Sequence, residues 1–249
     1  ADLTNRTWTV ESLPDETLAR YLGGKGLAAH LLFEVAPPGV DALAPESPMI
    51  IATGPAVSSR LAPANRYALF AKSPLTGIFG EAYAGGFVAP AISATGYDAI
   101  VLEGEADEPL YLEIQPAGAT FHDGSNVWGM DLYEAEEALE KDVGVRGAKS
   151  IVIGPAGENQ VAFAAVGNDQ GHVAGRTGMG AVLGAKLVKG IVFHGDQSRE
   201  LFDPDEIADY NRDLRRRGQE SAGVQAFGRM GTPATAASVN VAQAFPSRY

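Results

Sequence analysis

The chain of 249 residues contains 30 glycines and no cysteine, and its formal net charge at pH 7 is −12. This acidic balance argues against nucleic acid and anionic membranes as partners, and the lack of cysteine excludes disulfides and thiolate metal sites within these residues. Because no apolar run approaches the ~18 residues of a membrane helix and no secretory signal is visible, we expect a globular protein of the cytoplasm.

Apolar periodicity and turn residues predict alternating short strands and helices along most of the chain. In the first hundred residues they predict strands at 8–11, 49–53, 67–72 and 99–103, and helices at 15–22, 27–33 and 86–94. From there to residue 195 they predict strands at 110–114, 120–122, 150–153, 161–166 and 191–193, and helices at 132–141 and 180–187.

The remainder of the chain differs in character. Asp203 is placed to cap a helix with Pro204 at its first position, and we expect that helix to end at Gly218. The residues beyond it are polar and alanine-rich, with too few large apolar side chains to form a core. We therefore expect one domain at 1–198 and the beginning of a helical domain, cut short, at 199–249.

One pattern occurs twice, about a hundred residues apart. Met49–Ala56 (MIIATGPA) and Ser150–Ala156 (SIVIGPA) are each followed by a strand, a glycine-rich stretch, a small-residue helix and a closing strand. Two copies are too few for a solenoid and suit two half-units related by a pseudo-two-fold axis, each offering a glycine-rich loop to half of a shared ligand. Chance recurrence of Gly-Pro turns in a glycine-rich chain is the alternative.

The strongest candidate for ligand binding is the polar, glycine-rich segment 168–180, which leads into a predicted helix. Its backbone amides would cradle phosphate and Arg176 would add a bidentate contact, whereas a plain connection of tight turns is the alternative. The matching segment of the first copy is 81–86. Arg66 is either an anion clamp or a solvated residue at a strand end. Of the histidines, which show no metal-ligand spacing, only His172 lies in the loop.

Eight motifs in collinear order resemble one family. They read YLGGKGLA at 21–28, PPGVDAL at 37–43, PESP at 45–48, ATGP at 52–55, KSPLTG at 72–77, GYDAI at 96–100, IGPAGEN at 153–159 and AGRTGMGAV at 174–182. From residue 2 to about 195 the chain thereby resembles the N-terminal domain of the tungsten-containing aldehyde:ferredoxin oxidoreductases. Its tail resembles the start of the helical region that follows in that family.

The resemblance implies an α+β fold: two β-sheets related by a pseudo-two-fold axis, with flanking helices, followed by the start of an α-helical domain. On this base the family binds a bis-molybdopterin cofactor that holds tungsten or, in some relatives, molybdenum. Magnesium joins the two pterin phosphates through backbone carbonyls, and an arginine bridges the pterin and a [4Fe–4S] cluster.

By motif position the bridging arginine falls on Arg66 and the magnesium contacts on Tyr83 and Val173. The full set of cofactor-binding positions that the resemblance implies is Arg66, Tyr83, Gly85, Gly86, His172, Val173, Gly175 and Arg176. Two stretches depart from the family pattern. A relative has Asn-Ser-Gly-Gly where this chain has Tyr83–Gly86, and His-Arg-Ala-Ala-Gly-Arg at 171–176. Backbone contacts survive such changes, whereas the side-chain contacts at 83 and 172 are altered.

The family's enzymes oxidise aldehydes to carboxylic acids and pass electrons through the cluster to ferredoxin. Because this chain has no cysteine, the resemblance implies that missing C-terminal domains or a partner subunit hold the cluster, and no catalytic residue falls in this segment. A homodimer is compatible with the sequence. The alternatives are a relative acting on another substrate, and a stand-alone, non-catalytic domain of the same fold that binds a phosphorylated ligand, a cofactor or a partner chain.

Overall fold

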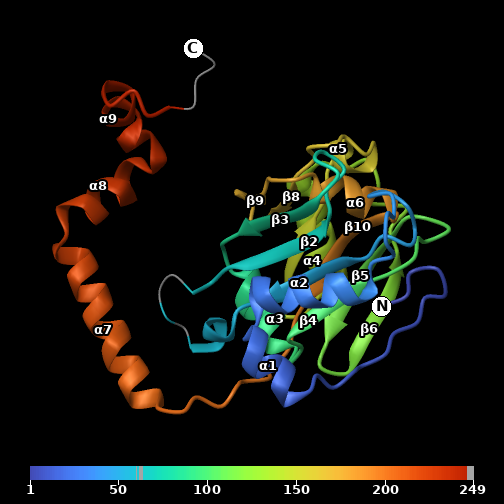
Figure 1. Cartoon of the computed structure of the whole chain (residues 1–249), viewed down its shortest axis with the longest axis horizontal. Coiled ribbons are helices and arrows are strands. Elements are labelled where there is room, and N and C mark those ends of the chain that lie inside the picture. The colour runs from blue at the N-terminus through green and yellow to red at the C-terminus, as the bar shows by residue number, and fades with distance from the viewer. Residues whose placement is uncertain (60, 62–63, 246–249) are drawn as a thin grey trace. The chain divides into compact units, whose positions relative to one another are not determined.

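The computed structural model describes residues 1–59, 61 and 64–245 of the chain. They form two compact units, one covering Ala1–Glu200 and the other beginning at Leu201 (Figure 1). The helices of the first unit are α1 (Asp15–Tyr21), α2 (Gly24–Val35), the 3-10 helix η1 (Pro55–Ser59), α3 (Val88–Ala94), α4 (Leu132–Val143), α5 (Pro155–Glu158) and α6 (Met179–Ala185). Its strands are β1 (Met49–Thr53), β2 (Tyr67–Lys72), β3 (Phe79–Ala84), β4 (Ala99–Leu102), β5 (Leu110–Gln115), β6 (Gly118–Asp123), β7 (Lys149–Val152), β8 (Val166–Asn168), β9 (His172–Ala174) and β10 (Val188–Phe193).

The described strands form two sheets. The first has the order β3-β2-β1-β4 with antiparallel neighbours throughout. The second has the order β6-β5-β10-β7-β8-β9, and β5 and β10 are its one parallel pair among the described residues. This arrangement confirms the predicted α+β class with two sheets and flanking helices.

The sequence repeat is also a structural repeat. The order β3-β2-β1-β4 recurs in the second sheet as β9-β8-β7-β10, and a short helix, η1 or α5, follows the first strand of each half. Likewise α3 joins β3 to β4 and α6 joins β9 to β10. Strands β5 and β6 are inserted between the halves and extend only the second sheet, so the repeat is uneven.

Both sheets contribute to one hydrophobic core. Apolar residues of β1, β2, β5 and β10 meet those of α3 and α6 there, and the fully buried members include Ile51, Leu69, Leu112, Val88, Leu183 and Ile191. Helix α2 packs Ala28 and Leu32 on the other face of the first sheet, and α4 packs Ala135 and Leu139 on the other face of the second. Burial of each large aliphatic side chain contributes about 1.5–3 kcal/mol, so these layers fix the sheets that carry the glycine-rich segments.

Three predicted elements are wrong in position. The strand predicted at 8–11 is absent, and residues 8–14 have no regular secondary structure. The Trp8 ring packs directly on Gly118 and leaves no room there for a Cβ. The strand predicted at 161–166 begins only at Val166, because tight turns follow α5. Helix α7 (Pro204–Glu220) continues through Gly218, where an ion pair between Arg216 and Glu220 spans the glycine.

The second unit consists of helices without a core of its own. It holds α7, α8 (Ala222–Met230), the 3-10 helix η2 (Thr232–Thr235) and α9 (Ala236–Val241), in which no described residue is buried. Asp203 caps α7 as predicted, accepting a hydrogen bond from the Glu206 N–H at 2.8 Å. Residues 246–249 of the predicted helical domain lie outside the described residues. Within the described part, no helix is long and apolar enough to cross a membrane.

Candidate functional site

The glycine-rich segments of the two halves meet at the edges of the sheets. Strands β3 and β9, each the outermost strand of its sheet on that side, lie next to each other (Figure 1). Thr177, just after β9, donates its hydroxyl to the Glu81 carbonyl at 3.2 Å and accepts at its own carbonyl a bond from the Ser73 hydroxyl at 2.8 Å. Residues about a hundred positions apart thus form one continuous surface.

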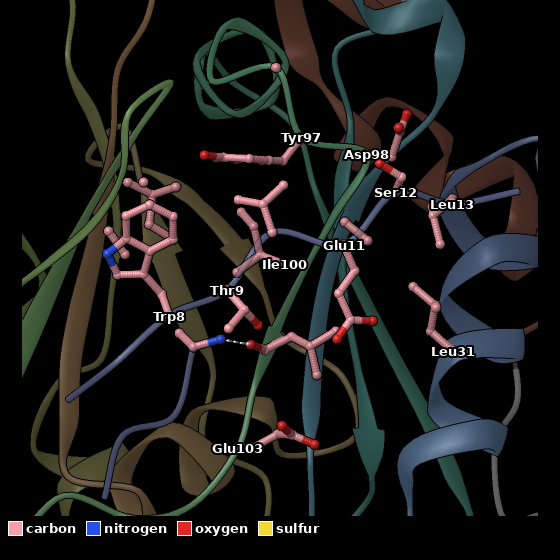
Figure 2. A pocket seen from close by; sticks show the side chains of 18 of the residues that line it. Trp8, Thr9, Glu11, Ser12, Leu13, Leu31, Tyr97, Asp98, Ile100 and Glu103 are labelled. Carbon is pink, nitrogen blue, oxygen red and sulfur yellow. Dashed lines mark hydrogen bonds between the residues drawn. The ribbon is translucent and has the colours of Figure 1, made fainter. Parts of the chain in front are cut away.

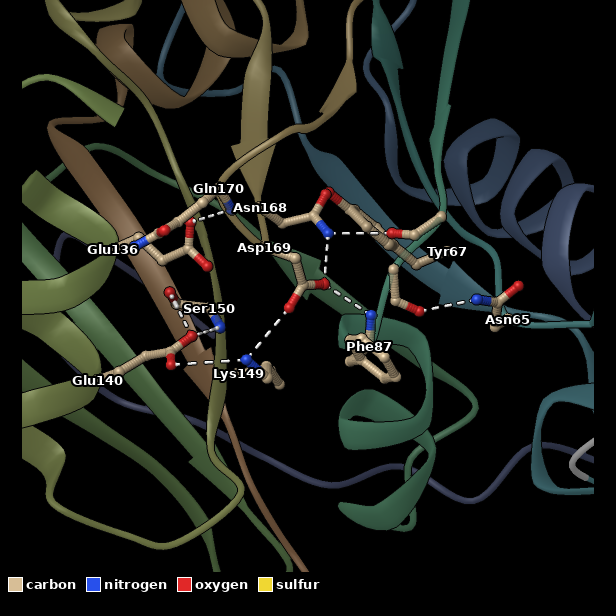
Figure 3. Close-up of polar contacts among 12 residues, drawn as sticks. Asn65, Tyr67, Phe87, Glu136, Glu140, Lys149, Ser150, Asn168, Asp169 and Gln170 are labelled. Carbon is tan, nitrogen blue, oxygen red and sulfur yellow. Dashed lines mark hydrogen bonds and ion pairs between the residues drawn. The ribbon is translucent and has the colours of Figure 1, made fainter. Parts of the chain in front are cut away.

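Side chains of the second half hold the backbone of the first. The Asn168 amide donates to the Gly85 carbonyl at 3.0 Å, and its oxygen accepts from the buried Tyr67 hydroxyl at 2.9 Å (Figure 3). The Asp169 carboxylate accepts from the Phe87 N–H at 2.6 Å. The end of β8 and the residue that follows it therefore help to fix the position of 84–87.

Gly86 is required by this packing, whereas Gly85 leaves room. Gly86 has φ +96°, and a Cβ there would lie 2.7 Å from Asn168 Nδ2 and closer still to Asp169 Oδ2. A Cβ on Gly85 would meet only His172 Nδ1, at 3.8 Å. One glycine thus lets the two segments pack closely, and the other leaves backbone accessible to a ligand.

The predicted residues of the first half surround this junction. Arg66 is exposed directly before β2, and its neighbour Asn65 donates to the Gly86 carbonyl at 2.9 Å. Tyr83 lies on β3 with 38% of its surface exposed.

The predicted residues of the second half follow the edge of β9. His172, Val173, Gly175 and Arg176 are all exposed. The hydrogen bond that Glu81 accepts from Lys25 lowers the pKa of its carboxyl, and the charge of nearby Arg176 adds a smaller decrease. The structure thus brings the predicted positions of both halves to the junction, where Gly86 is buried and the other seven are exposed or partly exposed, and their contacts with a cofactor remain a prediction.

A small polar cluster fixes the side chain of Tyr83. Its hydroxyl donates to Glu81 at 3.0 Å, and the same carboxylate pairs with Lys25 at 2.8 Å. Desolvation, followed by the contact with Glu81, raises the pKa of Tyr83 to about 12. The Tyr83 phenol therefore stays protonated and keeps its hydrogen bond to Glu81.

The side chains that join the halves were not assigned a role from the sequence. Asn65 and Tyr67 received none, and Asn168 and Asp169 were noted only as part of the candidate loop. The sequence did show two adjacent polar residues, Asn168 and Asp169, at the end of an apolar stretch. Their partners Tyr67 and Phe87 lie more than 80 positions away, so the contacts could not be predicted from the sequence.

The donor groups suit a phosphate-bearing ligand better than a metal bound by side chains. Neither Arg66 nor Arg176 forms an ion pair with another described residue, and among the junction glycines Gly175 is exposed and Gly85 partly exposed. Among the described residues, no group of three or more His, Asp or Glu side chains could hold a metal ion. The residues therefore fit a cofactor held by its phosphates and by main-chain carbonyls.

A cavity of about 550 Å³ lies elsewhere in the first unit, between the N-terminal segment, α2 and β4 (Figure 2). Among the described residues that line it are Trp8, Glu11, Leu31, Tyr97 and Ile100, and none is a predicted site residue. The junction of the glycine-rich segments is thus an open surface separate from this cavity.

Comparison with known proteins gives the relatives of the chain. The tungsten-containing aldehyde ferredoxin oxidoreductase of Pyrococcus furiosus is 41% identical over 194 residues, which cover 78% of this chain and 32% of that protein. The Pyrococcus horikoshii enzyme is 35% identical over 244 residues, or 96% and 39% of the two chains. The WOR-like subunit of an aliphatic sulfonate oxidoreductase of P. furiosus is 31% identical, covering 78% of this chain and 33% of that subunit. The chain thus spans about a third of the length of these curated relatives.

A solved structure and a family model point to the same family as these relatives. The active-site complex BamBC of benzoyl coenzyme A reductase matches with a TM-score of 0.84 at 30% identity, over 88% of this chain and 33% of that one. The model of the aldehyde ferredoxin oxidoreductase N-terminal domain matches residues 1–195. The chain therefore belongs to the aldehyde ferredoxin oxidoreductase family, and its first unit is the N-terminal domain of that family.

Proposed function

We propose that the chain is the cofactor-binding base of a tungstopterin oxidoreductase. Its two glycine-rich segments would each hold one pterin phosphate of a bis-molybdopterin cofactor. The observation that carries this proposal is the junction of β3 and β9, where positions implied by the family in both halves of the repeat meet on one surface. A two-fold arrangement of binding segments suits a ligand made of two like halves.

The residues of the junction have distinct roles in this proposal. Arg176 supplies positive charge to a phosphate, and Arg66 bridges the pterin and the cluster. Main chain at Gly85, Gly86, His172 and Gly175 approaches the phosphates, and the carbonyls of Tyr83 and Val173 would hold the magnesium ion. The bound cofactor supplies the redox chemistry at its tungsten, or molybdenum, centre. The chain itself contributes binding and orientation.

For the whole protein we propose oxidation of an aldehyde to a carboxylic acid, with electrons passing through a [4Fe–4S] cluster to ferredoxin. The cluster would be held by domains or a partner subunit outside these residues. An aldehyde is favoured because the two aldehyde oxidoreductases are 41% and 35% identical, against 31% for the sulfonate oxidoreductase subunit and 30% for the benzoyl coenzyme A reductase chain.

The test is the tungsten, molybdenum and pterin-phosphorus content of the protein purified from its native source. We expect stoichiometric metal and pterin, and a large loss of both after Arg66→Ala but not after Arg146→Ala, which removes an exposed arginine beyond α4, away from the glycine-rich segments. Wild-type content in the Arg66→Ala protein would refute the role of that arginine. A native protein that contains neither metal nor pterin would support the stand-alone binding domain instead.

A further inference from the structure

The Asp169 carboxylate has three partners at the junction. Its side chain is 9% exposed, and its Oδ2 accepts from the Phe87 N–H at 2.6 Å and from the Asn168 amide at 2.9 Å. Its Oδ1 pairs with Lys149 Nζ on β7 at 3.1 Å (Figure 3). One carboxylate therefore connects the backbone of the first half to a lysine of the second.

Asp169 and Gln170 are the central residues of the tight turn between β8 and β9, which the Gly171 N–H closes by donating to the Asn168 carbonyl at 3.3 Å. Asp169 and Gln170 have φ values of 45° and 48°, in the left-handed region that non-glycine residues seldom adopt. The Gln170 N–H donates to the buried Glu136 carboxylate of α4 at 3.0 Å. A turn of this kind needs a left-handed backbone at both central residues, and contacts with α4, β7 and the first half also hold it here.

Two hydrogen bonds and an ion pair keep Asp169 ionised despite its burial. Burial opposes ionisation, but the Phe87 N–H, the Asn168 amide and Lys149 together hold the pKa of Asp169 below its ordinary value. Lys149 also lies 3.8 Å from Glu140 of α4, which accepts bonds from the Ser150 backbone and hydroxyl. The ion pair is thus anchored to the helix that covers the second sheet.

We propose that Asp169, held by Lys149, is a positioning residue that sets the spacing of the two glycine-rich segments before a ligand binds. This inference rests on the proposed function, in which each segment receives one phosphate of the same cofactor. If the segments are fixed in advance, binding does not have to order them, and the ligand is held more tightly. Asp169 itself need not touch the cofactor.

Amide hydrogen exchange of the unliganded 249-residue chain tests the coupling directly. We expect Asp169→Asn and Lys149→Met each to speed exchange at 84–87 and at 168–176 by about tenfold or more, because each removes a charge-assisted contact. Lys149→Arg keeps the ion pair and should preserve wild-type exchange. Glu113→Gln is the matched control, since Glu113 is a 15% exposed carboxylate of the same sheet paired with His122 and His194. It should leave both segments unchanged.

Three exchange results would overturn the proposal: wild-type rates in Asp169→Asn, a change confined to 168–176, or an equal increase throughout the first unit. The second readout is the pterin-phosphorus content of the natively purified protein, which should fall in Asp169→Asn and stay at the wild-type level in Glu113→Gln. Wild-type pterin content despite faster exchange would also overturn the positioning role. Absence of pterin from the wild-type protein would overturn the proposed function instead. In that case the exchange rates alone would still show whether Asp169 couples the two glycine-rich segments.

Discussion

Replacing Gly86 by alanine tests whether close packing at the junction stabilises the fold. A left-handed backbone at a residue with a Cβ costs about 1–2 kcal/mol. The new methyl would also displace Asp169 and so disturb the hydrogen bond from the Phe87 N–H to a charged group, which is worth about 1.5–3 kcal/mol. We therefore expect the free energy of unfolding to fall by about 2.5–5 kcal/mol.

The matched control is Gly129→Ala. Gly129 has φ +91°, close to the +96° of Gly86, but nothing lies within 4 Å of a Cβ there. The Gly129→Ala variant should therefore lose only about 1–2 kcal/mol of its free energy of unfolding, the cost of the left-handed backbone alone. Both tryptophans, Trp8 and Trp128, lie in the first unit, so their fluorescence during urea denaturation reports the unfolding of that unit. Equal losses in the two variants would refute the reasoning, since crowding against Asp169 would then cost nothing.

Two further predictions concern the pH dependence of stability. Burial opposes ionisation of Glu113, but hydrogen bonds from His194 and His122 lower its pKa, so its contribution is complete above its ordinary value near 4.5 and is lost as the pH falls through the lowered value. The urea midpoint of the wild type should therefore approach that of Glu113→Gln in acid, and a constant difference would contradict this. Burial lowers the pKa of Lys186 from 10.5 to about 8, so the unfolded chain binds more protons between these values. The wild type should gain stability relative to Lys186→Met as the pH rises from 8 to 10.5. A constant difference between the urea midpoints of the two proteins over this range would contradict the prediction.

Local signals predicted most of the fold. A continuous apolar run marked β1, and a Gly-Pro turn followed the first strand of each half. Asp131, directly before α4, forms a capping box with Glu134, a pattern that the sequence shows at the start of that helix. Signals of this kind lie within a few residues of the element that they define, which is why they can be read from one sequence.

The contacts that build the site are of another kind. Asp169 bonds to Phe87 across 82 positions, and its left-handed backbone has no glycine to announce it. The edge strands β3 and β9 were missed: β3 has the small residues Gly80, Ala82 and Ala84 on its buried side, and β9 has only three residues, two of them exposed. Family motifs located the candidate surface, but only the fold revealed the side chains that hold its two parts together.

The place of β10 in the second sheet has a consequence for folding during synthesis. The first sheet uses only residues up to Leu102, so its strands can pair while the ribosome is still translating the second half. The second sheet has β10 between β5 and β7, and it cannot close until Phe193 has left the ribosome. Until then β5 and β7 expose unpaired edges on the nascent chain. A translational pause before residue 188 would thus lengthen the interval in which these edges are open to aggregation or to chaperones.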